Sequence, residues 1–321
     1  GQAAASKLLP AMKSLYRLCG IRRPEFMGWS QVELDRKKYN RGLSPMSDTE
    51  FAADEFGNEL ERYLNSYEEI KAQVAEAEKL IRPELADAFF AAIKYPVFSA
   101  AAMATKTLQA QEARHIGRPD SFNSDEEALD AALRSYNAYQ EILSLTEYYN
   151  NRMSGGRWRG SMSCAPRKLP VFGEPLFPAP LSEDNKNSHA AAAPIETKLQ
   201  TDGCIVRNAC QWHSASAGAY VVDLLGHSNK AVALPKGESL TYRINTTRTD
   251  SCVLRIAAIP TQPNDKGDLR YSVTIDGGAP TTFSLKEKFR SEGWKQNVLR
   301  GQAIRTIDTK LNAGPHTITI T

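Results

Sequence analysis

The sequence predicts two folded parts in series, an antiparallel α-helical bundle followed by a C-terminal β-sandwich. Before residue 166, apolar residues recur at steps of three and four, which is the spacing of one helix face. Residues 166–195 contain six prolines and four consecutive alanines, as expected for a linker. From residue 196 the apolar residues form short alternating runs, which are typical of strands. A chain of 321 residues is long enough for both parts to bury a core.

Residues 1–47 predict a short lead-in helix and a loop. The apolar residues between positions 6 and 19 have helical spacing, which stops at Gly20, shortly before Pro24. Residues 28–45 show no period and are interpreted as a loop.

Residues 48–165 predict the helical bundle. Ser47, Asp48, Thr49 and Glu50 are N-cap candidates for its first helix. The apolar stripe of that helix comprises Phe56, Leu60, Tyr63, Tyr67, Ile70, Val74, Ala77 and Ile81. These steps of four and three place all of them on one face.

Two more long helices follow. Pro83 ends the first helix and starts the second, which Pro96 should kink because proline lacks a backbone donor. Ser124, with Glu127 three residues later, predicts a capping box at the start of the third helix. The short breaks between these helices favour an antiparallel bundle.

Eight strands are predicted in residues 196–321, and Asp276-Gly277-Gly278 indicates a hairpin between two of them. Short strands at near-regular spacing are typical of a β-sandwich. The expected strands are 220–224, 231–234, 239–245, 252–259, 270–275, 281–285, 303–311 and 316–321.

Composition argues against several classes of protein. The net charge of +3 supplies no field for steering polyanions, so neither a nucleic-acid nor a membrane partner is implied, and no apolar run approaches a membrane span. Five cysteines without a C-x-x-C spacing do not form a disulfide framework, although Cys204 and Cys210 could pair. The five histidines have no metal-ligand spacing, and no phosphate-binding or nucleophile motif occurs. We therefore predict no catalytic residue, cofactor or metal in this chain.

The tryptophans are the best candidates for binding. Trp29, Trp158, Trp212 and Trp294 lie in or near predicted loops. An exposed indole can stack on a sugar ring, but a tryptophan also fills domain junctions well, because it buries a large area at low entropic cost. Arg157 and Arg159 flank Trp158 and could pair with the carboxylate of a uronic acid or with acidic residues of the chain itself.

Several longer motifs resemble the C-terminal half of glycoside hydrolase family 115 in order and spacing. In the helical part they are residues 26–29 (FMGW), 48–51 (DTEF), 95–97 (YPV), 148–151 (YYNN), 155–163 (GGRWRGSMS) and 165–172 (APRKLPVF). In the later part they are Trp212, 225–228 (LGHS), 260–263 (PTQP), 269–270 (LR), 273–277 (VTIDG), Trp294 with 297–299 (NVL), and 314–317 (GPHT). The similarity covers nearly the whole chain.

This resemblance implies an inverting xylan α-1,2-glucuronidase, which removes glucuronic acid or its 4-O-methyl ether from glucuronoxylan. In the family an α/β domain and a catalytic TIM barrel precede a dimerising helical domain and a sandwich. The resemblance thus implies that residues 1–47 join a barrel absent from this chain and that the protein is periplasmic or extracellular. Independently of the resemblance, the first residue, Gly1, is interpreted as a remnant of tag removal.

Three hypotheses follow from the resemblance. In the first, the chain is an accessory region that is inactive alone, and residues 155–163 reach toward the sugar pocket with Arg157 and Trp158. In the second, the sandwich is a carbohydrate-binding module that uses exposed, coplanar Trp212 or Trp294. In the third, the chain is an oligomerisation scaffold that forms a homodimer through the bundle.

Overall fold

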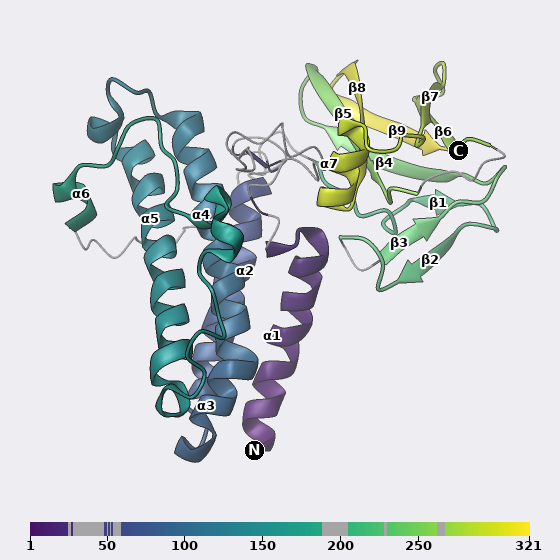
Figure 1. Cartoon of the computed structure of the whole chain (residues 1–321). Coiled ribbons are helices and arrows are strands. Elements are labelled where there is room, and N and C mark those ends of the chain that lie inside the picture. The colour runs from purple at the N-terminus through teal and green to yellow at the C-terminus, as the bar shows by residue number, and fades with distance from the viewer. Residues whose placement is uncertain are drawn as a thin grey trace. The chain divides into compact units, whose positions relative to one another are not determined.

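The computed structural model describes residues 1–24, 27, 48–49, 51, 53, 59–187, 205–227, 230–261 and 267–321. The chain divides into two compact units, Gly1–Cys204 and Ile205–Thr321. Long helices make up the first unit and antiparallel sheets dominate the second (Figure 1). The predicted fold class, a helical part followed by a β part, is therefore confirmed.

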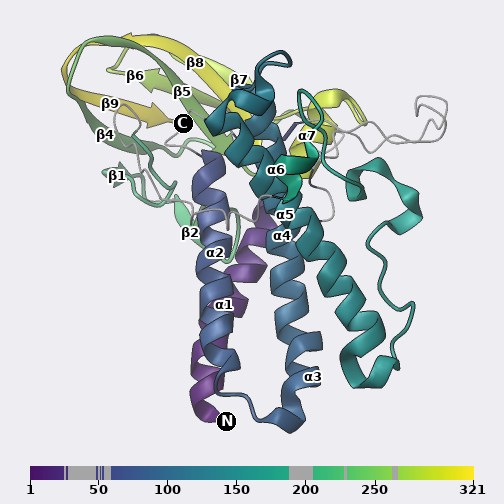
Figure 2. The same ribbon diagram turned by 90° about the vertical axis from the view of Figure 1, so that its left-hand side faces the viewer.

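Four long helices occur among the described residues of the first unit: α1 (Gln2–Ile21), α2 (Glu59–Glu78), α4 (Tyr95–Ile116) and α5 (Glu126–Glu147). Helix α1 packs on α2, α2 on α4, and α4 on α5, so that the helices lie side by side (Figure 2). The expected lead-in helix is longer than its periodicity suggested, since α1 has 20 residues and contains Pro10. Its Leu15 and Leu18 belong to the same buried cluster as the apolar stripe of α2.

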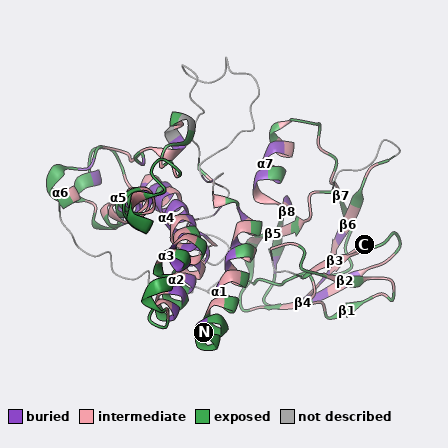
Figure 3. Ribbon diagram, turned by 60° about the horizontal axis from the view of Figure 1, so that its bottom comes forward, coloured by how far each residue is buried: buried purple, intermediate pink, exposed green. Residues whose placement is uncertain are grey.

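The apolar stripe predicted for α2 is confirmed wherever the structure describes it. Its buried members are Leu60, Tyr63, Tyr67, Ile70, Val74 and Ala77. Ile81 packs against the same core while partly exposed, and Phe56 lies outside the described residues. Buried positions recur along α2 and α4 in Figure 3.

The segment from Pro83 to Ile116 is a nearly continuous helical run. It consists of a 3₁₀ turn (Pro83–Leu85), α3 (Ala86–Phe89), a π-helical turn (Phe90–Lys94) and α4. Pro96 lies in the first turn of α4, directly after the π turn, so the irregularity expected at this proline is accommodated by the wider helix.

This run is long and apolar enough to cross a membrane by length and composition. This differs from the expectation that no apolar run approaches a membrane span. Core helices of soluble proteins pass the same test, and α4 packs between α2 and α5 with Val97, Ala101 and Leu108 fully buried.

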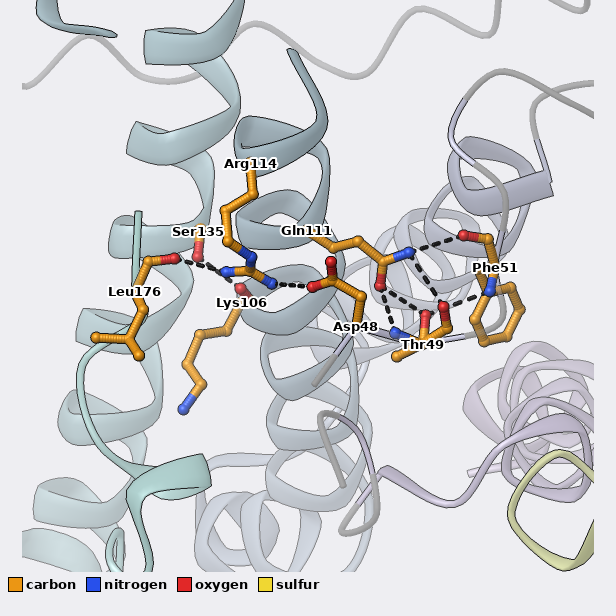
Figure 4. Close-up of polar contacts among 8 residues, drawn as sticks. All are labelled: Asp48, Thr49, Phe51, Lys106, Gln111, Arg114, Ser135 and Leu176. Atoms are coloured by element: carbon orange, nitrogen blue, oxygen red, sulfur yellow. Dashed lines mark hydrogen bonds and ion pairs between the residues drawn. The ribbon is translucent and has the colours of Figure 1, made fainter. Parts of the chain in front are cut away.

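Polar side chains of α4 hold the segment that precedes α2 (Figure 4). Gln111 accepts from the backbone nitrogen of Thr49 at 2.7 Å and from its hydroxyl at 2.8 Å, and it donates to the carbonyl of Phe51 at 2.8 Å. Arg114 pairs with Asp48. The prediction that Asp48 and Thr49 cap a helix is wrong, because both bind α4 and Phe51 is not helical.

The cap of α5 also differs from the prediction. The N-cap residue is Asp125, whose carboxylate accepts from the backbone nitrogen of Ala128 at 3.1 Å. Ser124 is instead the last residue of a 3₁₀ turn, and its hydroxyl donates to the carbonyl of Ser121 at 2.9 Å. The side chain of Ser124 is therefore bonded to the preceding 3₁₀ turn and does not cap α5.

The described part of the predicted linker packs on the bundle. It contains 3₁₀ turns at Pro166–Lys168 and Pro170–Phe172 and the short helix α6 (Glu183–Asn187). Val171 is buried in the core formed by α1, α2 and α4. Leu181 is buried in a second apolar cluster, together with Phe122 and alanines of α5. Arg114 donates to the carbonyl of Leu176 at 2.5 Å, which fixes the middle of this segment (Figure 4).

The described residues of the second unit form three antiparallel sheets. The five-stranded sheet has the order β1 (Ser214–Ala215), β4 (Leu240–Thr246), β9 (Gly314–Ile320), β6 (Arg270–Ile275), β7 (Thr281–Ser284). The pairs β2 (Tyr220–Asp223) with β3 (Lys230–Ala233) and β5 (Asp250–Ala258) with β8 (Ala303–Leu311) form the other two. One apolar cluster joins Tyr242, Val273 and Ile318 of the large sheet to Leu254 and Ile307, as in a sandwich.

The eight expected strands all occur, with bounds shifted by two residues at most. Asp276 and Gly277 both have positive φ, and the nitrogen of Gly278 bonds to the carbonyl of Ile275 at 2.9 Å, so the predicted hairpin turn after β6 is confirmed. Strand β1 and helix α7 (Glu292–Arg300) were not predicted.

Candidate functional site

The candidate site is the 153–163 loop, which follows α5. The helix continues through a π-helical turn, Tyr148–Arg152, into a 3₁₀ turn, Met153–Gly156. Met153 is 2% exposed and anchors the start of the loop in the bundle. Ser154, Gly155 and Gly156 have φ of 51°, 65° and 78°, so the helical path is broken there by a kink. Glycine adopts this region without steric cost, which explains the Gly pair.

Two polar anchors fix the loop. The backbone nitrogen and the hydroxyl of Ser154 both donate to Oδ2 of Asp87 on α3, at 2.8 and 3.0 Å. Asn150 donates to the carbonyl of Met162 at 2.9 Å and accepts from its nitrogen at 2.9 Å. This paired contact ties the two ends of the loop together, because an amide side chain can replace a backbone partner on both sides.

Aromatic rings support the base of the loop. The ring centroids of Phe90 and Tyr148 are 4.5 Å apart, and those of Tyr95 and Tyr149 are 4.8 Å apart. Phe90 comes from the π turn before α4 and Tyr148 from the π turn after α5. The two irregular turns therefore contact each other where the loop begins.

The side chains at the tip of the loop are exposed. Trp158 is 45% exposed, and Arg157 and Arg159 are also exposed. Among the described residues, neither arginine side chain has a hydrogen-bond or ion-pair partner. The loop thus presents two unpaired guanidinium groups and one indole ring from a fixed base. This combination can pair with a carboxylate and stack on a sugar ring.

The other predicted binding residues lie in the second unit. Trp212 is half-buried and packs against the sandwich core, so it is not the exposed platform that a carbohydrate-binding module needs. Trp294 lies on α7 rather than in a loop, and its ring meets that of Phe289 at 71° and a centroid distance of 5.1 Å. It is therefore neither fully exposed nor coplanar with its neighbour.

Two further expectations concern residues outside the described ranges. Trp29 and Cys204 are among these, so neither the role of Trp29 nor a Cys204–Cys210 pair is addressed by the structure. Cys19, Cys164, Cys210 and Cys252 form no disulfide with one another. In the part of the chain that is described, no three His, Cys, Asp or Glu residues are grouped in a way that could hold a metal ion.

Sequence reasoning missed Asp87 and Asn150, which position the loop. Asp87 is 67 residues away from Ser154, and nothing in a single sequence pairs the two. A usable signal existed for Asn150, since a polar amide just before a Gly-rich turn is a common side-chain partner for loop backbone.

Comparison with known proteins agrees with this architecture. Residues 211–321 match the C-terminal domain of glycosyl hydrolase family 115. The whole chain aligns with the structure of a family GH115 4-O-methyl-α-glucuronidase, BtGH115A, described as specific for decorated arabinogalactans, at 31% identity and a TM-score of 0.73. It covers 38% of that chain, so it corresponds to about two fifths of the relative.

A more distant match is a family 35 carbohydrate-binding module from Clostridium thermocellum. It has 15% identity and a TM-score of 0.27, with 33% of this chain and 77% of the module aligned, and it is too dissimilar to support an argument. A search of curated proteins finds no match. Residues 211–321 therefore match the glycosyl hydrolase family 115 C-terminal domain, and the chain as a whole is similar to the C-terminal region of a family 115 enzyme.

Proposed function

We propose that this chain is the accessory C-terminal region of an inverting α-glucuronidase that removes glucuronic acid, or its 4-O-methyl ether, from glucuronoxylan. The similarity to a 4-O-methyl-α-glucuronidase supports the uronic acid as the recognised sugar. That relative is described as acting on decorated arabinogalactans, so the shared chemistry is the uronate rather than the backbone that carries it. In this proposal the catalytic carboxylates lie in a barrel outside the present chain.

The 153–163 loop is the observation that carries the proposal. Asp87 and Asn150 hold its backbone, while Arg157 and Trp158 are exposed. A site whose backbone is fixed before the ligand arrives loses little conformational entropy on binding. In the proposed role, Arg157 pairs with the uronate carboxylate and Trp158 stacks on a pyranose ring.

A calorimetric titration tests this role. The ligands are glucuronic-acid-decorated xylo-oligosaccharides and, for comparison, undecorated ones of equal length. Saturable binding of the decorated ligand is expected, with a loss of about 10–100-fold for Arg157→Ala, because a hydrogen bond to a charged group contributes about 1.5–3 kcal/mol. Arg118→Ala is the matched control, since Arg118 is also exposed but lies between α4 and α5.

In a full-length enzyme that contains this chain, Arg157→Ala should lower kcat/KM for the decorated substrate by a similar factor. Unchanged kinetics, together with unchanged oligosaccharide binding by the isolated chain, would remove the loop from the proposal. Equal binding of decorated and undecorated ligands would contradict recognition of the uronate.

A scaffold function is a second candidate, and an exposed face of α1 favours it. Leu9 is 59% exposed and Tyr16 is 72% exposed, and their separation of seven residues places them on one face of the helix. Tyr16 also borders an open, mainly apolar groove lined by α1, α4 and α5. We propose that this face forms the interface of a homodimer through the bundle.

Sedimentation velocity tests the homodimer. The wild-type chain should sediment as a dimer, and Leu9→Glu and Tyr16→Glu should shift it to monomer. Leu176→Glu is the control, because Leu176 is 61% exposed and lies outside α1, on the segment that Arg114 of α4 holds. A monomeric wild-type chain at micromolar concentration would contradict the scaffold function.

A periplasmic or extracellular location is part of the glucuronidase proposal, since the polysaccharide substrate of that enzyme is found outside cells.

A further inference from the structure

The connection between β7 and α7 carries a compact aromatic and basic surface. We call it the basic–aromatic patch, and it comprises Lys286, Lys288, Phe289, Arg290 and Trp294. Phe289 is 67% exposed, which is unusual for a ring of this size. The ring meets that of Trp294 edge to face with the centroids 5.1 Å apart, and the guanidinium of Arg290 lies over the Phe289 ring, 5.0 Å from its centroid.

The cations of the patch are not matched by acidic partners. Lys286, Lys288 and Arg290 are exposed, and none has an ion pair with another described residue. The nearby carboxylates are engaged elsewhere: Glu287 bonds to Arg305 at 2.9 Å, Asp268 bonds to Arg270 at 2.7 Å, and Glu292 pairs with Lys295 at 3.8 Å. The patch therefore presents an excess of positive charge around an exposed ring.

The backbone of the patch is fixed from both sides. Arg305 donates to the carbonyl of Ser284 at 2.8 Å, and the nitrogen of Lys286 bonds to the hydroxyl of Ser284 at 3.0 Å. Ser291 caps α7 by accepting from the nitrogen of Trp294 at 3.2 Å, while its own nitrogen bonds to the carbonyl of Lys288 at 2.8 Å. The exposed side chains thus extend from a backbone that is held at both ends by hydrogen bonds.

Backbone strain supports a binding role. Arg290 has φ of 61°, a conformation that a non-glycine residue adopts at a cost of about 1 kcal/mol or more. Glycine would avoid this cost, yet the position holds an arginine whose guanidinium lies over Phe289. Such strained positions cluster at ligand-binding sites.

We propose that the basic–aromatic patch is a second carbohydrate-binding site, and that its ligand is a uronate-bearing oligosaccharide. Phe289 supplies the apolar face on which a pyranose ring stacks, and Lys288 and Arg290 supply the partners for a carboxylate. The choice of a uronate rests on the proposed function, whereas the stacking contact does not. The patch would hold the decorated polymer at a place separate from the 153–163 loop in the sequence.

The experiment uses the whole chain and reads the two candidate sites separately. Indole N–H resonances are assigned with Trp158→Phe and Trp294→Phe and then followed by NMR during titration with decorated xylo-oligosaccharides. The Trp294 signal should shift saturably in the wild type and in the double variant Arg157→Ala/Trp158→Phe. If the 153–163 loop does not bind the oligosaccharide, the Trp294 signal should still respond. The experiment therefore separates binding at the loop from binding at the basic–aromatic patch.

Three variants define the ligand contacts. Phe289→Ala and Arg290→Gln should each raise the dissociation constant measured from the Trp294 signal by at least about tenfold. This is the loss expected for one stacking or charge-assisted contact. Lys236→Ala is the matched control, because Lys236 is an exposed lysine without a described partner in the same unit. Circular dichroism confirms that each variant is folded.

Two results would overturn the proposal. The first is a Trp294 signal that does not respond to the decorated ligand or responds equally to the undecorated one. The second is binding of heparin or DNA with equal affinity in wild type and Phe289→Ala, which would show a general polyanion surface without a sugar-stacking ring.

Discussion

The Nδ1 atom of His316 lies 2.6 Å from Oδ2 of Asp276, and its Nε2 atom lies 2.7 Å from the carbonyl oxygen of Asn312. Both partners are acceptors, so this geometry requires a proton on each side of the ring or one shared with Asp276. The hydrogen bond to Asp276, followed by that to Asn312, raises the pKa of His316 above its usual value of 6.5. The same pair, together with the nitrogen of Thr317, lowers the pKa of Asp276 below 3.8.

The His316–Asp276 pair predicts a pH window of stability. The histidine contribution is complete below the unfolded pKa of 6.5 and disappears as the pH rises through the raised folded pKa. The aspartate contribution is complete above 3.8 and disappears as the pH falls through its lowered folded pKa. His316→Gln should therefore lower the free energy of unfolding most between pH 3.8 and pH 6.5, and little in alkaline solution.

Urea unfolding at a series of pH values, followed in the second unit, measures this effect. His213→Gln is the control, because His213 is an exposed histidine in the same unit. A stability difference between wild type and His316→Gln that stayed constant from pH 5 to pH 9 would show that packing alone, not the proton, matters.

The second prediction concerns Lys106, a buried lysine of α4. Its side chain is 3% exposed, and its Nζ atom donates to the carbonyls of Val171 and Gly173, both at 2.8 Å. Burial lowers the pKa of Lys106 to about 8, whereas the unfolded chain keeps this proton to 10.5. Between these pH values the unfolded state binds more protons, so the free energy of unfolding rises with pH.

Substitution with methionine should remove this dependence. The slope of unfolding free energy against pH should be smaller in Lys106→Met than in wild type by up to about 1.4 kcal/mol per pH unit within this window. Amide exchange around residues 171–173 should also accelerate, because two carbonyls lose their donor. Lys79→Met, an exposed lysine after α2, is the control. Parallel pH profiles for wild type and Lys106→Met would contradict the assignment.

The third prediction separates the observed cap of α5 from the expected one. Asp125→Ala removes the acceptor for the nitrogen of Ala128 and should lower the stability of the first unit by about 1 kcal/mol. Ser124→Ala removes only a hydroxyl that is bonded to the preceding turn, so it should cost much less. Urea midpoints of both variants test this difference, and a larger cost for Ser124→Ala would restore the capping box.

The error at Ser124 shows which details of the fold a sequence leaves open. Ser124 with Glu127 and Asp125 with Ala128 are adjacent starts for the same helix, and only the backbone at Asp125, with φ of −86° and ψ of 106°, decides between them. The helix itself was predictable, because its apolar residues keep one period over six turns. Strands β6 and β8 were predicted with the observed bounds for the same reason, since alternation is a strong signal.

Short or long-range features escaped prediction. Helix α7 has nine residues, too few for an apolar period to stand out, although Ser291 and Gly301 are suitable terminal residues. Arg157 and Trp158 were found as candidates from residue type alone. The contact between Asp87 and Ser154 that fixes their loop joins segments far apart in the sequence, and only the folded bundle brings them together.

The last prediction tests whether the 153–163 loop is held in place before any ligand binds. Asn150→Ala removes both hydrogen bonds to Met162 and should lower stability by about 1–2 kcal/mol, since these contacts are partly buried. The amide of Met162 should exchange much faster, because Asn150 is its described acceptor. Asn137→Ala is the control, as Asn137 is exposed on α5 and alanine is the better helix former there.

Asn150→Asp refines the test, because it keeps the acceptor for the nitrogen of Met162 and loses the donor to its carbonyl. Its Met162 amide should remain protected while the oligosaccharide affinity of the loop falls less than in Asn150→Ala. If both variants bound the decorated oligosaccharide like wild type, the fixed backbone would be irrelevant to binding. The exposed Arg157 and Trp158 would then act from a loop that orders only on contact with the sugar.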